Sequence, residues 1–246
     1  MSTDKEKLIT WATIGVLAYI ISDIVHEAIG HGGTAILFGN QITLLSSVYF
    51  RSEPRNIIDS IGGPIANLCF SIVAFFVLKK AKNIWAILFL IHVLTYNLFW
   101  FAGTIISSAV FKTGDWTFAI RSLNAGQSDR YILFIAGATI YYLAFRFLNA
   151  RLRQIVGENA LTRQDFVFPF LFASISAFVA GLFFSPARLS AGLEGVLEMT
   201  ASVPILFLSL NYVNEDVKPK PNSVYSLSVG ILYIAFCLTL GRGMSF

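Results

Sequence analysis

Two histidines and a glutamate lie close together near the end of the first apolar segment, in the order His26, Glu27, His31. Neutral imidazoles are common zinc ligands, and a nearby carboxylate can take a proton from a water molecule that the ion activates. The chain has only 3 histidines, so two of them in one short stretch stand out. Ionisable side chains inside an apolar span are costly and indicate function by default. This stretch is therefore a candidate zinc site.

The spacing of this motif, HExxxH, is one residue longer than the HExxH motif of zinc peptidases. On a regular α-helix, His26 and His31 would point about 140° apart and could not bind one ion. One solution keeps the helix regular and uses Glu27 and His31 as ligands. The other, which we favour, is a π-bulge that brings the two histidines together, eased by Gly30 and leaving Glu27 free as a base.

A catalytic zinc ion needs a third protein ligand and one open position. Asp115 is the preferred third ligand, because it follows Gly114 in a turn expected on the same side as the end of the first span. Asp23 is the competing ligand. Plainer interpretations also exist: Asp115 could be a loop aspartate that caps a short helix, and the motif could be a polar helix face buried against other spans. His92 is predicted to be a hydrogen-bonded structural histidine, because it lies toward the opposite end of its span.

The composition identifies the surroundings in which these residues act. Of the 246 residues, 56% are hydrophobic and only 13% are charged, which excludes a soluble globular domain. The net charge of +4 does not indicate a nucleic-acid partner, because Lys and Arg form short clusters between apolar runs. Cys69 and Cys237 lie far apart inside apolar runs, which argues against a disulfide framework and against a CxxC metal or redox site.

Apolar runs long enough to cross about 30 Å of hydrocarbon recur along the chain. They cover residues 8–30, 61–78, 84–108, 131–148, 167–185 and 224–241, with a shorter candidate at 199–213. The expected fold is therefore an all-α polytopic membrane protein with six or seven transmembrane helices. It forms one membrane-embedded domain over residues 1–246, with a core at 8–148 and additional C-terminal helices at 165–241.

Residues 42–50, between the first two spans, are rich in β-branched and aromatic side chains and predict a small interfacial β-strand or hairpin. More Lys and Arg fall in the loops on the N-terminal side than in those on the other side, which predicts a cytoplasmic N-terminus. Neither the membrane concerned nor the oligomeric state follows from the sequence.

Three elements in this order resemble the site-2 protease family of intramembrane zinc metalloproteases. Residues 26–40 are similar to the family's His-Glu helix, which continues to a glycine, and residues 42–50 to the membrane-associated strand after it. Residues 62–68, Gly-Gly-Pro-Ile-Ala-Asn-Leu, are similar to its small-Gly-Pro-x-x-Asn element. The resemblance covers roughly residues 8–120. The chain departs from the family in two ways. The His-Glu motif has one extra residue, and the family's Asp-Gly ligand pattern is replaced here by Gly114-Asp115-Trp116.

The resemblance implies a Zn²⁺ ion held by His26, His31 and an aspartate from a later span, here Asp115. It also implies Glu27 as the catalytic acid and base and Asn67 near the reacting carbonyl. The expected function is an intramembrane zinc-dependent peptidase that hydrolyses a peptide bond of a membrane-associated protein substrate. The substrate would be held extended by pairing with the edge of the predicted strand.

The alternative is a catalytically inactive relative of such enzymes that acts as a binding or regulatory module in the membrane. The lengthened motif is the best argument for this alternative. Zinc content separates the two functions, because only the peptidase requires the ion.

Overall fold

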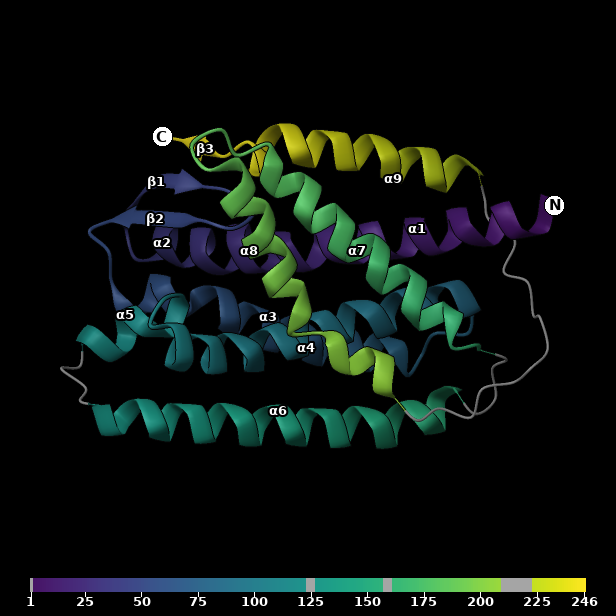
Figure 1. The fold of residues 1–246 in the computed structure, drawn as a ribbon, viewed down its shortest axis with the longest axis horizontal. Coiled ribbons are helices and arrows are strands. Elements are labelled where there is room, and N and C mark those ends of the chain that lie inside the picture. The colour runs from purple at the N-terminus through teal and green to yellow at the C-terminus, as the bar shows by residue number, and fades with distance from the viewer. Residues whose placement is uncertain (1, 123–126, 157–160, 209–222) are drawn as a thin grey trace.

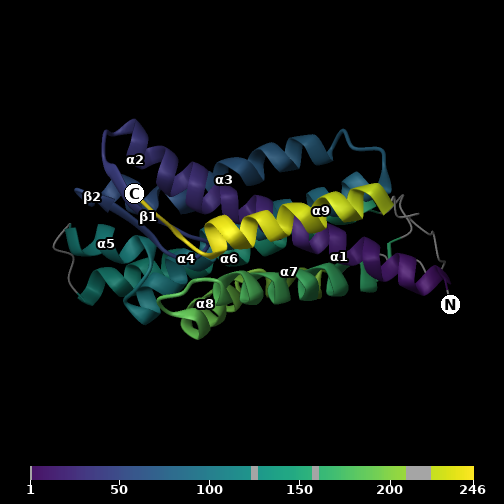
Figure 2. The same ribbon diagram turned by 90° about the horizontal axis from the view of Figure 1, so that it is seen from above.

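The computed structural model describes residues 2–122, 127–156, 161–208 and 223–246. Long helices run along one direction, and a small sheet lies at the end of the bundle opposite the N-terminus (Figures 1 and 2). The short helix α5 and both strands of the hairpin lie at this same end (Figure 1). The predicted all-α class with a hairpin after the first span is confirmed.

The first span is one continuous helical rod made of three segments. Helix α1 (Ser2–Asp23) leads into the π-helical segment η1 (Ile24–Gly32), which continues into the short helix α2 (Gly33–Leu37). The predicted π-bulge is thus confirmed, and it extends over the whole His-Glu motif. The alternative in which the motif sits on a regular α-helix is wrong.

The remaining helices follow the expected order along the chain. They are α3 (Ile57–Leu78), α4 (Ile84–Phe111), α5 (Asp115–Ser122), α6 (Gln127–Val156), α7 (Gln164–Leu182), α8 (Arg188–Thr200) and α9 (Ser223–Phe236). Helix α1 packs against α4, α7 and α9, and α3 packs against both α4 and η1. The site motif, which lies on η1 of the first span, is therefore packed against α3.

Five helices of the described chain are long and apolar enough to cross a membrane. They are Lys5–Leu37, Ile57–Leu78, Ile84–Phe111, Ser128–Gln154 and Gln164–Leu182. These match five of the six predicted runs, and the sixth run corresponds to a shorter apolar helix, Tyr225–Gly241. The further candidate at residues 199–213 lies partly outside the described residues.

Helix α6 shows why an apolar environment suits this fold. It runs along one edge of the bundle (Figure 1) and exposes large apolar side chains, such as Ile132 at 64% and Ile135 at 63%. Such a surface is a liability in water, whereas lipid chains cover it without penalty. The exposed face of α6 is compatible with a membrane protein.

The sheet has three short antiparallel strands in the order β2-β1-β3. Strand β1 (Gln41–Leu45) pairs with β2 (Phe50–Glu53) on one side and with β3 (Met244–Ser245) on the other. Because β3 covers β1 at Leu44 and Leu45, an incoming strand would meet the outer edge of β2. Strand β1, the larger part of the predicted edge, is thus the central strand.

Candidate metal centre

The π-helical turn brings the two histidines of the motif onto one side. The Nε2 atoms of His26 and His31 are 3.2 Å apart, and the two residues are five positions apart in sequence. Both residues are buried, with exposed fractions of 8% and 3%. The extra residue of the motif is therefore absorbed by the wider helical turn, which has its hydrogen bonds between residues i and i+5.

Asp115 reaches the same point from the N-terminus of helix α5. Its Oδ2 atom is 3.4 Å from Nε2 of His26, and its Oδ1 atom is 3.4 Å from Nε2 of His31. The structure thus brings together the three side chains proposed as ligands. They come from two segments that lie far apart in sequence.

The turn before α5 explains how Asp115 is held in place. Gly114 has a φ of +88°, in the left-handed region that glycine adopts without strain. The next residue, Trp116, anchors α5 to α4, because its backbone N–H donates to Oγ of Ser108 and its indole N–H donates to Oγ1 of Thr104. The start of α5 is therefore fixed against the long helix that precedes it.

The separations of the three donor atoms fit a zinc ion. With metal–ligand bonds of about 2.0–2.1 Å and tetrahedral geometry, donor atoms lie about 3.3 Å apart. The distances of 3.2, 3.4 and 3.4 Å among His26, His31 and Asp115 match this spacing. Two imidazoles and one carboxylate are also a ligand set that zinc prefers, and three protein ligands leave one position open.

The second ring nitrogen of each histidine also has a partner, as metal-binding imidazoles generally do. Nδ1 of His31 is 2.6 Å from the backbone oxygen of Asp59, which can only accept, so the ring carries its proton on Nδ1 and leaves Nε2 free to bind a metal. Phe50 of strand β2 stacks on this ring, with centroids 5.1 Å apart.

Asn67 plays the corresponding part for His26. Its side-chain amide lies 3.0 Å from Nδ1 of His26, and its Oδ1 atom is buried without a hydrogen-bond partner among the described residues. Turning the amide places Oδ1 against Nδ1 as the acceptor that a metal-binding tautomer needs. Asn67 is therefore placed to position His26, while its expected role near the reacting carbonyl stays a prediction.

The Gly-Gly-Pro element of α3 has a steric role. A Cβ atom on Gly63 would press against Nε2 of His31 and would lie 2.8 Å from Nε2 of His26. A Cβ atom on Gly30 would lie 2.5 Å from Cα of Gly63. Gly30 was expected to ease the helix deformation, but its contact shows a different requirement: the two backbones must approach closely for α3 to reach the imidazoles.

Glu27 lies beside the two histidines. One of its carboxylate oxygens and one ring nitrogen each of His26 and His31 all lie within 4.8 Å of one another. Glu27 is only 4% exposed, and its Oε2 atom has no hydrogen-bond partner among the described residues. With Asp115 at ligand distance from both imidazoles, Glu27 is free to interact with a water molecule at the site.

The charge of Asp115 also suits a ligand. Burial alone would raise the pKa of Asp115, but without an ion the protonated imidazoles of His31 and His26 outweigh this effect and hold its pKa well below the usual range. Asp115 is therefore ionised near neutral pH, the form in which a carboxylate binds a metal. Its side chain is 21% exposed, more than those of the two histidines, so the site opens on its side.

Sequence reasoning missed Asp59, which connects three parts of the site. Its Oδ2 atom accepts hydrogen bonds from Nδ2 of Asn40 and from Oγ of Ser52, and its backbone oxygen contacts His31. The predicted second span began at residue 61, so Asp59 was placed in the preceding loop, whereas α3 begins at Ile57. The available signal was a carboxylate three positions before the Gly-Gly-Pro element.

Two other polar residues lie outside the cluster. Asp23, the competing ligand, is buried at the end of α1, and neither of its carboxylate oxygens has a hydrogen-bond partner among the described residues. His92 is buried in α4, where Nδ1 lies 2.8 Å from the backbone oxygen of Leu88. The prediction of a hydrogen-bonded structural histidine is confirmed for His92.

Comparisons of this chain with protein-family models, with curated proteins and with solved structures found no match. Any assignment of function therefore depends on the geometry of the site.

Proposed function

We propose that this chain is a multi-pass membrane peptidase of the site-2 protease type that uses one zinc ion held by His26, His31 and Asp115. The observation that carries the proposal is the triangle of donor atoms, with sides of 3.2, 3.4 and 3.4 Å. Direct hydrogen bonds between such groups are most often about 2.9–3.0 Å long. The spacing favours groups arranged around an ion.

A zinc ion held there would supply the Lewis acidity that makes water a nucleophile near neutral pH. Glu27 is the base that accepts a proton from the attacking water and the acid that returns it to the leaving amine. Its neighbours exclude bulk water, since His26, Glu27 and His31 are each less than a tenth exposed. Asn67 and the backbone oxygen of Asp59 hold the imidazoles in their orientations.

The substrate in this proposal is a membrane-associated protein whose chain is extended at the cleavage site. A helical substrate hides its carbonyl groups in hydrogen bonds, so it must unwind before water can attack. The outer edge of β2 is the edge that could hold the unwound chain, because β1 is paired on both sides. Phe50 of β2 stacks on His31, which places this strand beside the site.

The topology in this proposal places the N-terminus in the cytoplasm. The loop after α3 carries Lys79, Lys80 and Lys82, and it shares its side of the bundle with the N-terminus. Cytoplasmic loops are enriched in Lys and Arg. The metal centre then lies toward the opposite face of the membrane.

Substitution of the base tests the proposal. Glu27→Gln should lower the rate of cleavage of a membrane-anchored reporter by about 10²–10⁴-fold, because the general base is lost, while zinc stays near one ion per chain. The matched control is Glu6→Gln, the same chemical change on an exposed residue at the start of α1, which should retain both activity and zinc.

Two results would contradict the proposal in different ways. Unchanged cleavage by Glu27→Gln would exclude Glu27 as the base. Purified wild-type protein that binds no zinc would overturn the peptidase and favour the non-catalytic membrane module.

A further inference from the structure

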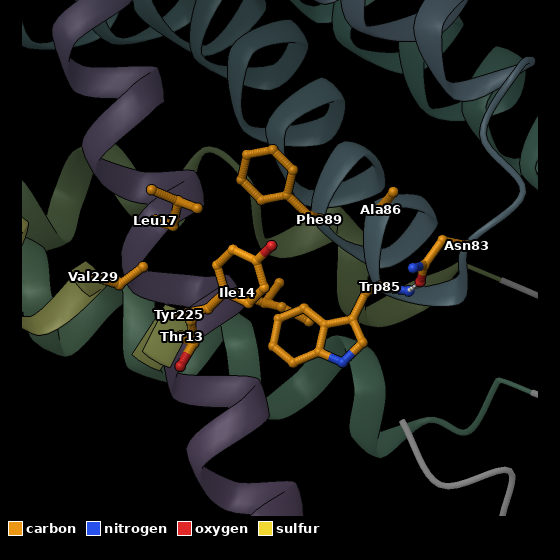
Figure 3. Close-up of a pocket in the computed structure, with 9 residues that line it drawn as sticks. All are labelled: Thr13, Ile14, Leu17, Asn83, Trp85, Ala86, Phe89, Tyr225 and Val229. Carbon is orange, nitrogen blue, oxygen red and sulfur yellow. Dashed lines mark hydrogen bonds between the residues drawn. The ribbon is translucent and has the colours of Figure 1, made fainter. Parts of the chain in front are cut away.

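A cavity lies at the end of the bundle away from the candidate metal centre. It has a volume of about 440 Å³ and opens between α1, the start of α4 and α9. Figure 3 shows Trp85, Phe89 and Tyr225 around it, together with aliphatic side chains. The lining residues are Thr13, Ile14, Leu17, Asn83, Trp85, Ala86, Phe89, Tyr225 and Val229. This volume is in the range of small-ligand sites.

Two polar side chains of this cavity have partners within the protein. Thr13 donates to the backbone oxygen of Ile9 and contacts Oγ of Ser226, and the side-chain oxygen of Asn83 accepts from the backbone N–H of Trp85. The rest of the wall is mainly aromatic and aliphatic. A ligand of this cavity therefore needs an apolar part that fits between these aromatic and aliphatic side chains.

The cavity is too small for the helix of a partner protein. A volume of 440 Å³ equals roughly one turn of an α-helix with its side chains, which is about 10 Å across. A single hydrocarbon chain is thin enough to enter between α1, α4 and α9. Trp85 and Tyr225 near the mouth are side chains of the type that gathers at membrane interfaces, where lipid chains meet their headgroups.

Positive charge lies next to the cavity. Lys80 and Lys82 are exposed in the connection between α3 and α4, and Lys82 directly precedes Asn83 of the cavity wall. Under the topology proposed above, this end faces the cytoplasmic leaflet, which holds the anionic lipids. The neighbouring basic loop therefore complements an anionic headgroup.

We propose that this cavity binds one acyl chain of an anionic phospholipid, with the phosphate headgroup against Lys80 and Lys82. The site is independent of the metal centre, because the two share no residue. Only the assignment to the cytoplasmic leaflet rests on the proposed topology. Lipid binding can therefore be tested whether or not the chain is a peptidase.

The test uses the purified full chain in detergent with phosphatidylglycerol or phosphatidylcholine whose acyl chains carry bromine, which quenches nearby tryptophan fluorescence. Trp85 is the reporter, and Trp85→Phe identifies its part of the signal from the 4 tryptophans. We expect phosphatidylglycerol to quench Trp85 at about tenfold lower concentration than phosphatidylcholine does. Equal quenching by the two lipids would overturn the headgroup assignment.

Filling the cavity tests the site of the acyl chain. Ala86→Phe should abolish the quenching of Trp85 by both lipids, whereas Ala136→Phe, the same change on the exposed face of α6, should leave it intact. Leu17→Phe fills the cavity from α1 and serves if Ala86→Phe fails to fold. Undiminished quenching in a folded cavity-filled variant would overturn the proposal.

Removing the charges tests the headgroup contact separately. The double substitution Lys80→Gln and Lys82→Gln should bring the phosphatidylglycerol concentration dependence to that of phosphatidylcholine. Lys112→Gln, an exposed lysine between α4 and α5, is the control and should keep the preference. A preference that survives in the double variant would exclude these two lysines.

Discussion

Two aspartates, the partly exposed Asp115 at the candidate metal centre and the buried Asp165 in the first turn of α7, have very different surroundings. Asp165 accepts hydrogen bonds of 2.8 Å from the indole N–H of Trp11, and of 2.8 and 2.9 Å from the backbone and side chain of Thr162. Asp115 instead lies 3.4 Å from the nearest ring nitrogens of His26 and His31. One carboxylate has complete partners, and the other is separated from its neighbours by the spacing of metal ligands.

The histidines differ in the same way. His92 lies alone in α4, and one ring nitrogen is 2.8 Å from the backbone oxygen of Leu88. His26 and His31 each have a partner at Nδ1, while their two Nε2 atoms face each other at 3.2 Å. The difference teaches that burial of a polar side chain does not identify a functional site. What distinguishes the candidate site is the convergence of three potential ligand atoms, from two separate segments, on one point.

The sharpest way to break this comparison is to remove one histidine from each environment. His31→Ala should reduce bound zinc from about one ion per chain to near zero, because two ligands cannot hold the ion in a site built for three. His92→Gln should keep the zinc and lose only about 1 kcal/mol of stability. Metal analysis of both purified variants, with thermal unfolding in detergent, checks this. Equal zinc loss in both would remove the distinction.

A smaller effect is expected when every ligand is kept and only the close approach of α3 is changed. Gly63→Ala adds a Cβ atom against Nε2 of both histidines, so the imidazoles must move. Changes to groups that orient metal ligands typically cost about 10–100-fold in metal affinity, and we expect zinc affinity to fall toward the upper end of this range.

Gly230→Ala is the matched control for this substitution. Gly230 lies in α9, where an added Cβ atom would meet nothing within 4 Å, so zinc affinity should stay unchanged. Competition titration with a zinc chelator measures both variants. Wild-type affinity in Gly63→Ala would mean that the backbone contact is not required for the site.

The smallest effect is expected for Asp59, whose backbone oxygen contacts the ring of His31. Asp59→Ala leaves the donors of Asn40 and Ser52 without their acceptor, at a cost of about 1–3 kcal/mol each if they stay buried. Because Asp59 also sets the position of His31, zinc affinity should fall by about tenfold. Asp165→Ala should lower the unfolding temperature comparably but leave zinc affinity unchanged. A zinc affinity that falls equally in both variants would mean that Asp59 acts only through stability.

Much of the site could be predicted from local sequence, and the π-helix shows how. A spacing of five residues between His26 and His31 is incompatible with one ion on a regular helix, so the geometry of a single helical turn was enough to predict the bulge. The long apolar runs and the hairpin also depend on local patterns. Each of these predictions requires only the direction of side chains along one element.

Other features could not be predicted because they depend on distances between elements. The sequence predicts a loop at Asp59, because the end of a helix is harder to locate from a sequence than the helix itself. The contact of Asp59 with His31 joins two different helices, so no pattern along one segment indicates it. The pairing of β3 with β1 joins residues about 200 positions apart, and no local pattern indicates it. Tertiary packing of the last strand thus decided which edge of the sheet stays open.

By itself, the sequence determined that the chain suits a lipid environment. It also determined that one helix carries two histidines and a glutamate, which are side chains that could form a metal site. The tertiary structure alone decided that Asp115, rather than Asp23, lies at ligand distance from both histidines. It also decided that Gly63 allows α3 to touch the imidazoles. The physical reason is that composition and periodicity act along one chain segment, whereas a metal centre needs atoms from separate segments within about 3.3 Å of one another.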